Sequence, residues 1–115
     1  MKTETQILHD CCEALAAGGY FFWRQNNLPV PGRAMPKYTP KGLPDIMILH
    51  RGRFIAVECK RAGGAEDERE PNGRKVRAGH LSPFQAEWGA NCALNGGHFF
   101  IVRSVTELTD SLAKL

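Results

Sequence analysis

The stretch LPDIMILHRGRFIAVECK, residues 43–60, decides the fold of this chain. Two apolar runs flank the short connection His50-Arg51-Gly52, which is the pattern of a β-hairpin. The second run ends in Glu58-Cys59-Lys60, although a buried carboxylate or ammonium group is costly unless something compensates it. A second acid, Asp45, begins the first run. The hairpin therefore raises the question of what compensates these charges.

Strand geometry brings the three charged residues together. Side chains alternate along a strand, so Glu58 and Lys60 share one face of the returning strand. Asp45 starts one strand where Glu58 and Lys60 end the other, so all three lie at the same end of the hairpin. Two carboxylates with a few waters are a ligand set that Mg²⁺ prefers, and a bound cation compensates the burial of both acids. The alternative is a surface ion pair at a strand end beside a Pro-Asp turn.

The remaining groups at this end of the hairpin have roles in the same hypothesis. The backbone carbonyl of Cys59 lies between the two ligand positions and completes the inner shell of the predicted metal site. Lys60, held beside the metal, orients or helps to deprotonate an attacking water, or neutralises charge that develops on a phosphoryl group. These roles predict phosphodiester hydrolysis.

Length and composition limit the protein class. The chain has 115 residues, 43% of them hydrophobic and 23% charged, which predicts one globular domain over 1–115. Fifteen Lys and Arg against twelve Asp and Glu give a formal charge of +3, which permits a polyanionic partner without requiring one. The four cysteines form no C-x-x-C pair, which indicates buried, reduced thiols. The sequence also contains no apolar run long enough to span a membrane, so we expect a cytoplasmic protein.

The N-terminal segment predicts a helix from Thr3 to about Ala17, because its apolar residues recur at helical spacing and two glycines follow. Glu4 falls within the apolar stripe of this helix, whereas Glu13 falls on the opposite face. Glu4 therefore points toward the core. A first-turn acid favoured by the helix dipole is an equally good explanation of Glu4.

The segments before the hairpin are a short aromatic strand over 20–24 and a proline-rich loop over 26–42. The loop carries Arg33, Lys37 and Lys41 without any acid. Such a cationic loop can hold a phosphate backbone, and ordinary solvated loop charges explain it equally well. Arg24, at the end of the aromatic strand, either binds phosphate or pairs with an acid.

The segments after the hairpin complete the predicted order. Residues 61–80, rich in glycine and in charges of both signs, predict a long loop. A helix begins after it with Ser82 as N-cap, Pro83 at the first position and Gln85 as capping-box partner. We expect its buried face to contain Phe84, Trp88 and Cys92, and expect a strand over 98–103 and a last helix from Ser104. The order α-β-β-β-α-β-α predicts an α/β domain with a mixed sheet of about four strands flanked by helices.

The sequence resembles the PD-(D/E)XK nuclease superfamily, and within it the small stand-alone VRR-NUC proteins of phages and prophages, which are similar in organisation to archaeal Holliday-junction resolvases. The resemblance covers nearly the whole chain. The loop over 62–79 is longer than the usual connection in that family. The segments that carry the resemblance are Glu4, Trp23-Arg24, Gly42-Leu43-Pro44-Asp45, Ile55-Ala56-Val57-Glu58-Cys59-Lys60, Leu81-Ser82-Pro83-Phe84-Gln85 and the glycine-rich turn before the last strand.

The resemblance implies a restriction-endonuclease-like fold and a role for each matched residue. Asp45 and Glu58 would be the principal ligands of Mg²⁺ or Mn²⁺, and Lys60 the catalytic lysine. Glu4 would be a further acid that acts directly or through water. Gln85 would contact the metal-bound water, although a capping-box side chain bonded to Ser82 is a nearly equal alternative and both roles are compatible.

The resemblance further implies a metal-dependent endonuclease that cuts DNA, with four-way junctions or flaps as the expected substrate. We expect a homodimer, because two related cuts across a junction need two sites. The aromatic run Tyr20-Phe21-Phe22-Trp23 supports an apolar interface, with a fully buried strand as the alternative. The expected setting is a bacterial host cell, with the chain encoded by a phage or prophage. The alternatives are an RNA nuclease and a nucleic-acid-binding accessory protein that does not cleave.

Overall fold

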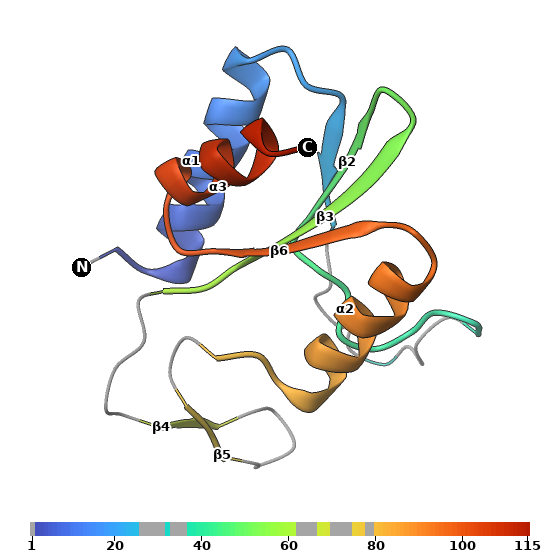
Figure 1. Cartoon of the computed structure of the whole chain (residues 1–115). Coiled ribbons are helices and arrows are strands. Elements are labelled where there is room, and N and C mark those ends of the chain that lie inside the picture. The colour runs from blue at the N-terminus through green and yellow to red at the C-terminus, as the bar shows by residue number, and fades with distance from the viewer. Residues whose placement is uncertain (1, 26–31, 33–36, 62–66, 70–74, 78–79) are drawn as a thin grey trace.

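The computed structural model is an α/β fold with one four-stranded sheet and three helices (Figure 1). It describes residues 2–25, 32, 37–61, 67–69, 75–77 and 80–115. The order of the main sheet is β1-β2-β3-β6, and β4 and β5 form a separate two-stranded sheet. The elements are α1 (Glu4–Ala17), β1 (Phe22–Arg24), β2 (Ile46–His50), β3 (Arg53–Cys59), β4 (Asp67–Arg69), β5 (Lys75–Arg77), α2 (Pro83–Leu94), β6 (His98–Val102) and α3 (Val105–Ala113).

The predicted hairpin is confirmed as the centre of the sheet. β2 and β3 pair antiparallel, with Ile46 opposite Val57 and His50 opposite Arg53. Arg51 and Gly52 connect them with φ values of 51° and 78°, as a two-residue turn between twisted strands requires. β6 pairs parallel with β3, so the sheet is mixed as predicted. Asp45 therefore lies directly before β2 at the end where β3 finishes.

The two faces of the sheet carry different helices (Figure 1). α1 and α3 cover one face, where a continuous apolar core joins α1 to β2, β3 and β6. The apolar stripe predicted for the first helix is confirmed, since its residues Ile7, Leu8, Cys11 and Leu15 are all buried in α1. α2 lies against the other face beside β6. The sheet therefore separates α2 from α1 and α3.

The sequence prediction for the start of α2 is confirmed, and the prediction for its buried face is confirmed only in part. Ser82 is the N-cap and forms a complete capping box with Gln85. Gly89, however, is the only fully buried residue of α2, while Phe84 is exposed and Trp88 and Cys92 are half-buried. A Cβ atom on Gly89 would lie 2.6 Å from the Phe99 ring, so α2 packs through a glycine and its larger side chains lie to either side.

The segment over 61–80 also differs from the prediction of a long loop. Its described part contains β4 and β5, which pair antiparallel with Asp67 opposite Arg77. Charged residues and glycines dominate this segment, so no alternation of apolar and polar residues indicated a strand.

The lengths of the helices bear on membrane insertion. The longest described helix, α1, has 14 residues. No helix in the described part of the chain is both long and apolar enough to cross a bilayer.

Candidate active site

Asp45 is fixed at the junction of three strands. Its side-chain Oδ2 accepts a hydrogen bond of 2.8 Å from the backbone N–H of Cys59 on β3. Its backbone oxygen accepts one of 2.8 Å from the N–H of Gln25, directly after β1. The carboxylate is therefore held against the end of β3, next to Glu58.

Glu58 and Lys60 are buried at this end of the sheet, with 3% and 8% of their surfaces exposed. The Lys60 Nζ lies 3.8 Å from Oε1 of Glu58, which is an ion-pair distance rather than a hydrogen bond. The alternative of a surface ion pair is excluded by this burial. The position of Lys60 is fixed by its backbone N–H, which donates to the carbonyl of Val102 on β6 at 3.0 Å.

Gln85 connects α2 to this cluster. Its Nε2 donates a hydrogen bond of 3.0 Å to Oε1 of Glu58, and its Oε1 accepts one of 2.9 Å from the backbone N–H of Ser82. The Ser82 hydroxyl in turn accepts from the backbone N–H of Gln85 at 3.2 Å. The same side chain thus completes the capping box, which was one of the two roles expected for Gln85, and also contacts Glu58. Its contact with a metal-bound water stays a prediction.

Glu4 and Glu13 lie on different sides of α1, as the helical periodicity predicts. Glu4 is half-buried, and its charge raises the pKa of Glu58, so the two carboxyl groups are neighbours. Glu13 is exposed and lies 3.8 Å from the His9 ring nitrogen Nε2. α1 therefore brings one acid to the hairpin and leaves the other in solvent.

Gly42 is a residue of this site for which the sequence predicted no separate role. Its φ is 78°, and an added Cβ would lie 2.4 Å from the backbone carbon and oxygen of Phe84 and 2.7 Å from the backbone nitrogen of Gln85. The segment before Asp45 thus packs directly on the first turn of α2. A glycine next to the Leu-Pro-Asp sequence was the available signal, because only glycine permits so close an approach.

The electrostatics of the cluster follow from burial of two neighbouring acids. Burial raises the pKa of Glu58 to about 9, and the nearby Asp45 charge acts in the same direction. Burial also raises the pKa of Asp45, opposed by the hydrogen bond from Cys59. Lys60 lowers the pKa of both acids but does not cancel the effect of burial. Without a further cation, Glu58 therefore retains a proton at neutral pH.

The available ligand atoms fit a hard divalent cation. Oε2 of Glu58 and Oε1 of Glu4 are buried, and neither accepts a hydrogen bond from the described residues. In the same part of the chain, no three His, Cys, Asp or Glu side chains form a group ready to hold a metal. The buried carboxylate oxygens that remain available to a cation are thus few, and come from Glu58 and Glu4. So small a protein contribution suits Mg²⁺, which keeps several waters.

Three of the residues predicted to bind nucleic acid lie at different places in the described structure: Arg24, Lys37 and Lys41. Arg24 is exposed on β1, and its charge lowers the pKa of Asp45, so it lies beside the acid cluster. Lys41 lies 5.0 Å from the centre of the Phe84 ring, at the first turn of α2. Lys37 lies 5.3 Å from the ring of Tyr38. Arg33 is outside the described residues.

Comparisons with known proteins support the architecture. No family model matches the chain. No curated protein matches it either. A solved structure described as a VRR_NUC domain superposes with a TM-score of 0.58 over 98% of this chain and 97% of the other, at 22% sequence identity. A sequence identity of 22% supports a fold shared by the two chains. The chain therefore has the fold of a VRR_NUC domain, the restriction-endonuclease-like architecture that the sequence predicted.

Proposed function

We propose that this protein is a metal-dependent nuclease of the VRR-NUC family that hydrolyses phosphodiester bonds in DNA. The observation that carries the proposal is the buried cluster of Asp45, Glu58 and Lys60, contacted by Gln85, in a chain with the fold of a VRR_NUC domain. Burying two acids and a lysine together costs free energy that a purely structural role does not require. A catalytic role explains why the cost is tolerated.

The residues of the cluster have separate tasks in this proposal. Asp45 and Glu58, with the backbone carbonyl of Cys59, hold Mg²⁺ or Mn²⁺, and Glu4 contributes a further acid directly or through water. When bound, the cation supplies positive charge that polarises the phosphoryl group and makes a water more acidic. Gln85 fixes the orientation of the Glu58 carboxylate through its hydrogen bond. Lys60 Nζ, buried beside Glu58, orients the attacking water or stabilises the charge that develops on the phosphoryl oxygens.

The proposed substrate is branched DNA, and the proposed working unit is a homodimer. Exposed aromatic residues support the dimer, because Phe21 is 66% exposed and Trp23 is 41% exposed. The alternative of a fully buried first strand is therefore wrong. Leu49 and Phe54, which are also exposed, pair directly across β2 and β3, and the Leu49 N–H donates to the Phe21 carbonyl at 3.1 Å. These residues form an apolar patch on the sheet that a second copy of the chain would cover.

The experiment compares a labelled four-way junction, a linear duplex of the same sequence and an RNA duplex, each with added Mg²⁺ or Mn²⁺. We expect cleavage of the junction in both strands, slower cleavage of the linear duplex and none of the RNA. Cleavage restricted to RNA would replace the proposal with an RNA nuclease. Binding to DNA without cleavage in either metal would replace it with an accessory protein.

A further inference from the structure

A groove between α1 and β1 has no role in the proposed chemistry so far. It encloses about 520 Å³, which is within the range of about 300–1,000 Å³ typical of small-molecule sites. Thr5, Leu8, His9 and Cys12 line one side of it. These four positions recur at the spacing of one helix face, and Gln6 and Asp10 of the same helix also line the groove.

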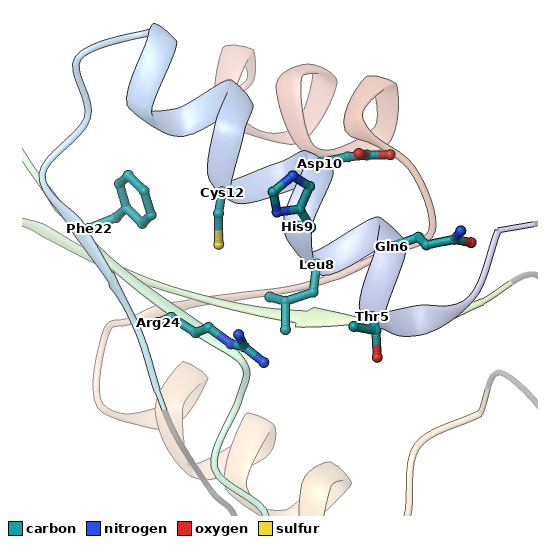
Figure 2. Close-up of a pocket in the computed structure, with 8 residues that line it drawn as sticks. All are labelled: Thr5, Gln6, Leu8, His9, Asp10, Cys12, Phe22 and Arg24. Carbon is teal, nitrogen blue, oxygen red and sulfur yellow. The ribbon is translucent and has the colours of Figure 1, made fainter.

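The floor of the groove is apolar and its edge is polar. Leu8, Cys12 and Phe22 provide the apolar surface, and Figure 2 shows Cys12 between the Phe22 ring and the His9 ring. The Thr5 hydroxyl and the Arg24 guanidinium lie at the opposite end from Cys12 (Figure 2). An apolar surface that includes the Phe22 ring, with the His9 ring beside it and a cation at one end, is complementary to an aromatic group that is attached to an anion.

The cationic end of the groove borders the acid cluster. Arg24 pairs with Ile46 across β1 and β2, one residue from Asp45, and its charge lowers the pKa of Asp45. Thr5 directly follows Glu4, whose charge acts on Glu58. An anion at Arg24 would therefore lie next to the proposed scissile phosphate, and the groove leads away from that point.

Among the described residues that line the groove, the acid is Asp10, and its charge is paired. Asp10 lines the groove but forms an ion pair with Lys2. This pair reduces the negative charge at the edge of the groove.

We propose that this groove binds one nucleobase of the DNA strand next to the cleaved phosphate, turned out of the base stack, with the adjoining phosphate at Arg24. The inference rests on the proposed nuclease function and adds a subsite to it. The Phe22 and His9 rings contact the base, which requires no particular base identity because every base has an aromatic face. Branched DNA supplies such a base at low cost, because nucleotides at a branch point are already partly unstacked.

The first test removes single bases from the substrate. A series of junctions carries one abasic nucleotide at each of the two positions on either side of the cleavage point, and cleavage is compared with that of the intact junction. We expect one position at which the abasic substitution lowers kcat/KM about tenfold, with little effect at the other three. Equal rates at all four positions would overturn the inference.

The second test measures occupancy of the groove directly. Cys12 lines this groove, whereas Cys92 lines a separate pocket between α2 and β3 and serves as an internal control. The rate of alkylation by N-ethylmaleimide at each thiol is measured by mass spectrometry, with and without the intact junction. Ca²⁺ replaces Mg²⁺ in both samples, because we expect its larger and looser coordination to allow DNA binding with little or no cleavage. We expect DNA to slow alkylation of Cys12 at least fivefold and to leave Cys92 unchanged. An unchanged rate at Cys12 under saturating DNA would contradict the inference.

A pair of variants separates the groove from the surface charge of α1. His9→Ala and Glu13→Ala both remove the His9–Glu13 pair, but only His9→Ala removes a ring from the groove. We expect His9→Ala to weaken junction binding about fivefold and to abolish the abasic effect, and Glu13→Ala to change neither. Equal behaviour of the two variants would contradict the inference.

The outcomes distinguish the groove from the nuclease proposal. Normal cleavage of the intact junction with no abasic effect and no protection of Cys12 would refute the groove and leave the nuclease. Protection of Cys12 without any cleavage would support the groove and refute the nuclease. Absence of both cleavage and DNA binding would refute both.

Discussion

Nε2 of Gln85 donates a hydrogen bond to Oε1 of Glu58 at 3.0 Å while Oε1 of the same amide accepts from the N–H of Ser82 at 2.9 Å. The bond to Ser82 determines which way the amide faces, because only its nitrogen remains to contact Glu58. The N-terminal cap of α2 therefore orients a proposed metal ligand on β3. Ser82 acts here as a positioning residue.

The first prediction is that Ser82→Ala lowers the rate of cleavage. Loss of the hydroxyl removes one half of the capping box, so the Gln85 amide is held less firmly against Glu58. We expect kcat to fall about tenfold with little change in KM, and Ser82→Thr, which keeps the hydroxyl, to restore it. Steady-state kinetics on the junction measure both constants.

Ser104→Ala is the matched control for this prediction. Ser104 caps α3 through the N–H of Glu107 at 3.1 Å, on the face of the sheet opposite to α2. Both alanine variants should lose about 1 kcal/mol of stability. An equal loss of kcat in the two variants would mean that the effect comes from stability alone.

The second prediction concerns the buried cluster itself. Asp45→Asn, Glu58→Gln and Lys60→Ala should each lower the cleavage rate at least about a hundredfold, because each removes a ligand or a charge that acts on the phosphoryl group. Circular dichroism should show that the three variants remain folded. Cleavage near the wild-type rate by any folded variant would contradict the proposed site.

The third prediction separates the two acids of α1. Glu4→Gln should lower the cleavage rate about tenfold, since Glu4 has a buried carboxylate oxygen near Glu58. Glu13→Gln should leave the rate unchanged because Glu13 is exposed on the other side of the helix. A cleavage assay in which Glu13→Gln lowers the rate and Glu4→Gln does not would show that Glu13, and not Glu4, acts at the site.

The fourth prediction follows from the pKa of Glu58, which burial raises from 4.5 to about 9. Between these values the folded protein keeps a proton that the unfolded chain releases, so the free energy of unfolding falls as pH rises. The loss begins near pH 4.5 and ends above pH 9. Glu58→Gln removes this contribution.

Thermal unfolding in the presence of a chelator measures the effect. The melting temperature of the wild type should fall more between pH 5 and pH 9 than that of Glu58→Gln, by at least about 4 °C for a domain of this size. Added Mg²⁺ should raise the wild-type melting temperature most at high pH, because the ionised carboxylate binds it. Parallel curves for the two proteins would show that Glu58 ionises normally.

The fifth prediction tests the homodimer. Wild-type chains are mixed with tagged Lys60→Ala chains, the mixed dimer is isolated, and both strands of a labelled junction are followed. We expect nicks in single strands without paired cuts, since each subunit acts on one strand. A monomer that makes paired cuts on its own would contradict the dimer.

Much of the central fold could be predicted because its signals are local. The hairpin is specified by two apolar runs and a two-residue turn, and strand alternation then places Asp45, Glu58 and Lys60 at one end. The sequence also shows the cap at Ser82, because capping residues occupy fixed positions relative to a helix start. These features depend on residues a few positions apart or on a single chain reversal.

The features that the sequence did not show depend on contacts between distant segments. The close approach of Gly89 to Phe99 changes which residues of α2 are buried, and a helical pattern alone does not specify it. The groove between α1 and β1 depends on the angle between a helix and a strand. The contact between Gln85 and Glu58 joins residues 27 positions apart, and became visible only when α2 was placed against the sheet.

Gly42 and Gly52 share a φ of 78° but differ in what surrounds them. An added Cβ at Gly52 meets nothing within 4 Å, whereas one at Gly42 would overlap the backbone of α2. A library randomised at both codons and selected for folded, active protein should therefore recover asparagine beside glycine at position 52, since asparagine tolerates positive φ. At position 42 the same selection should recover glycine alone.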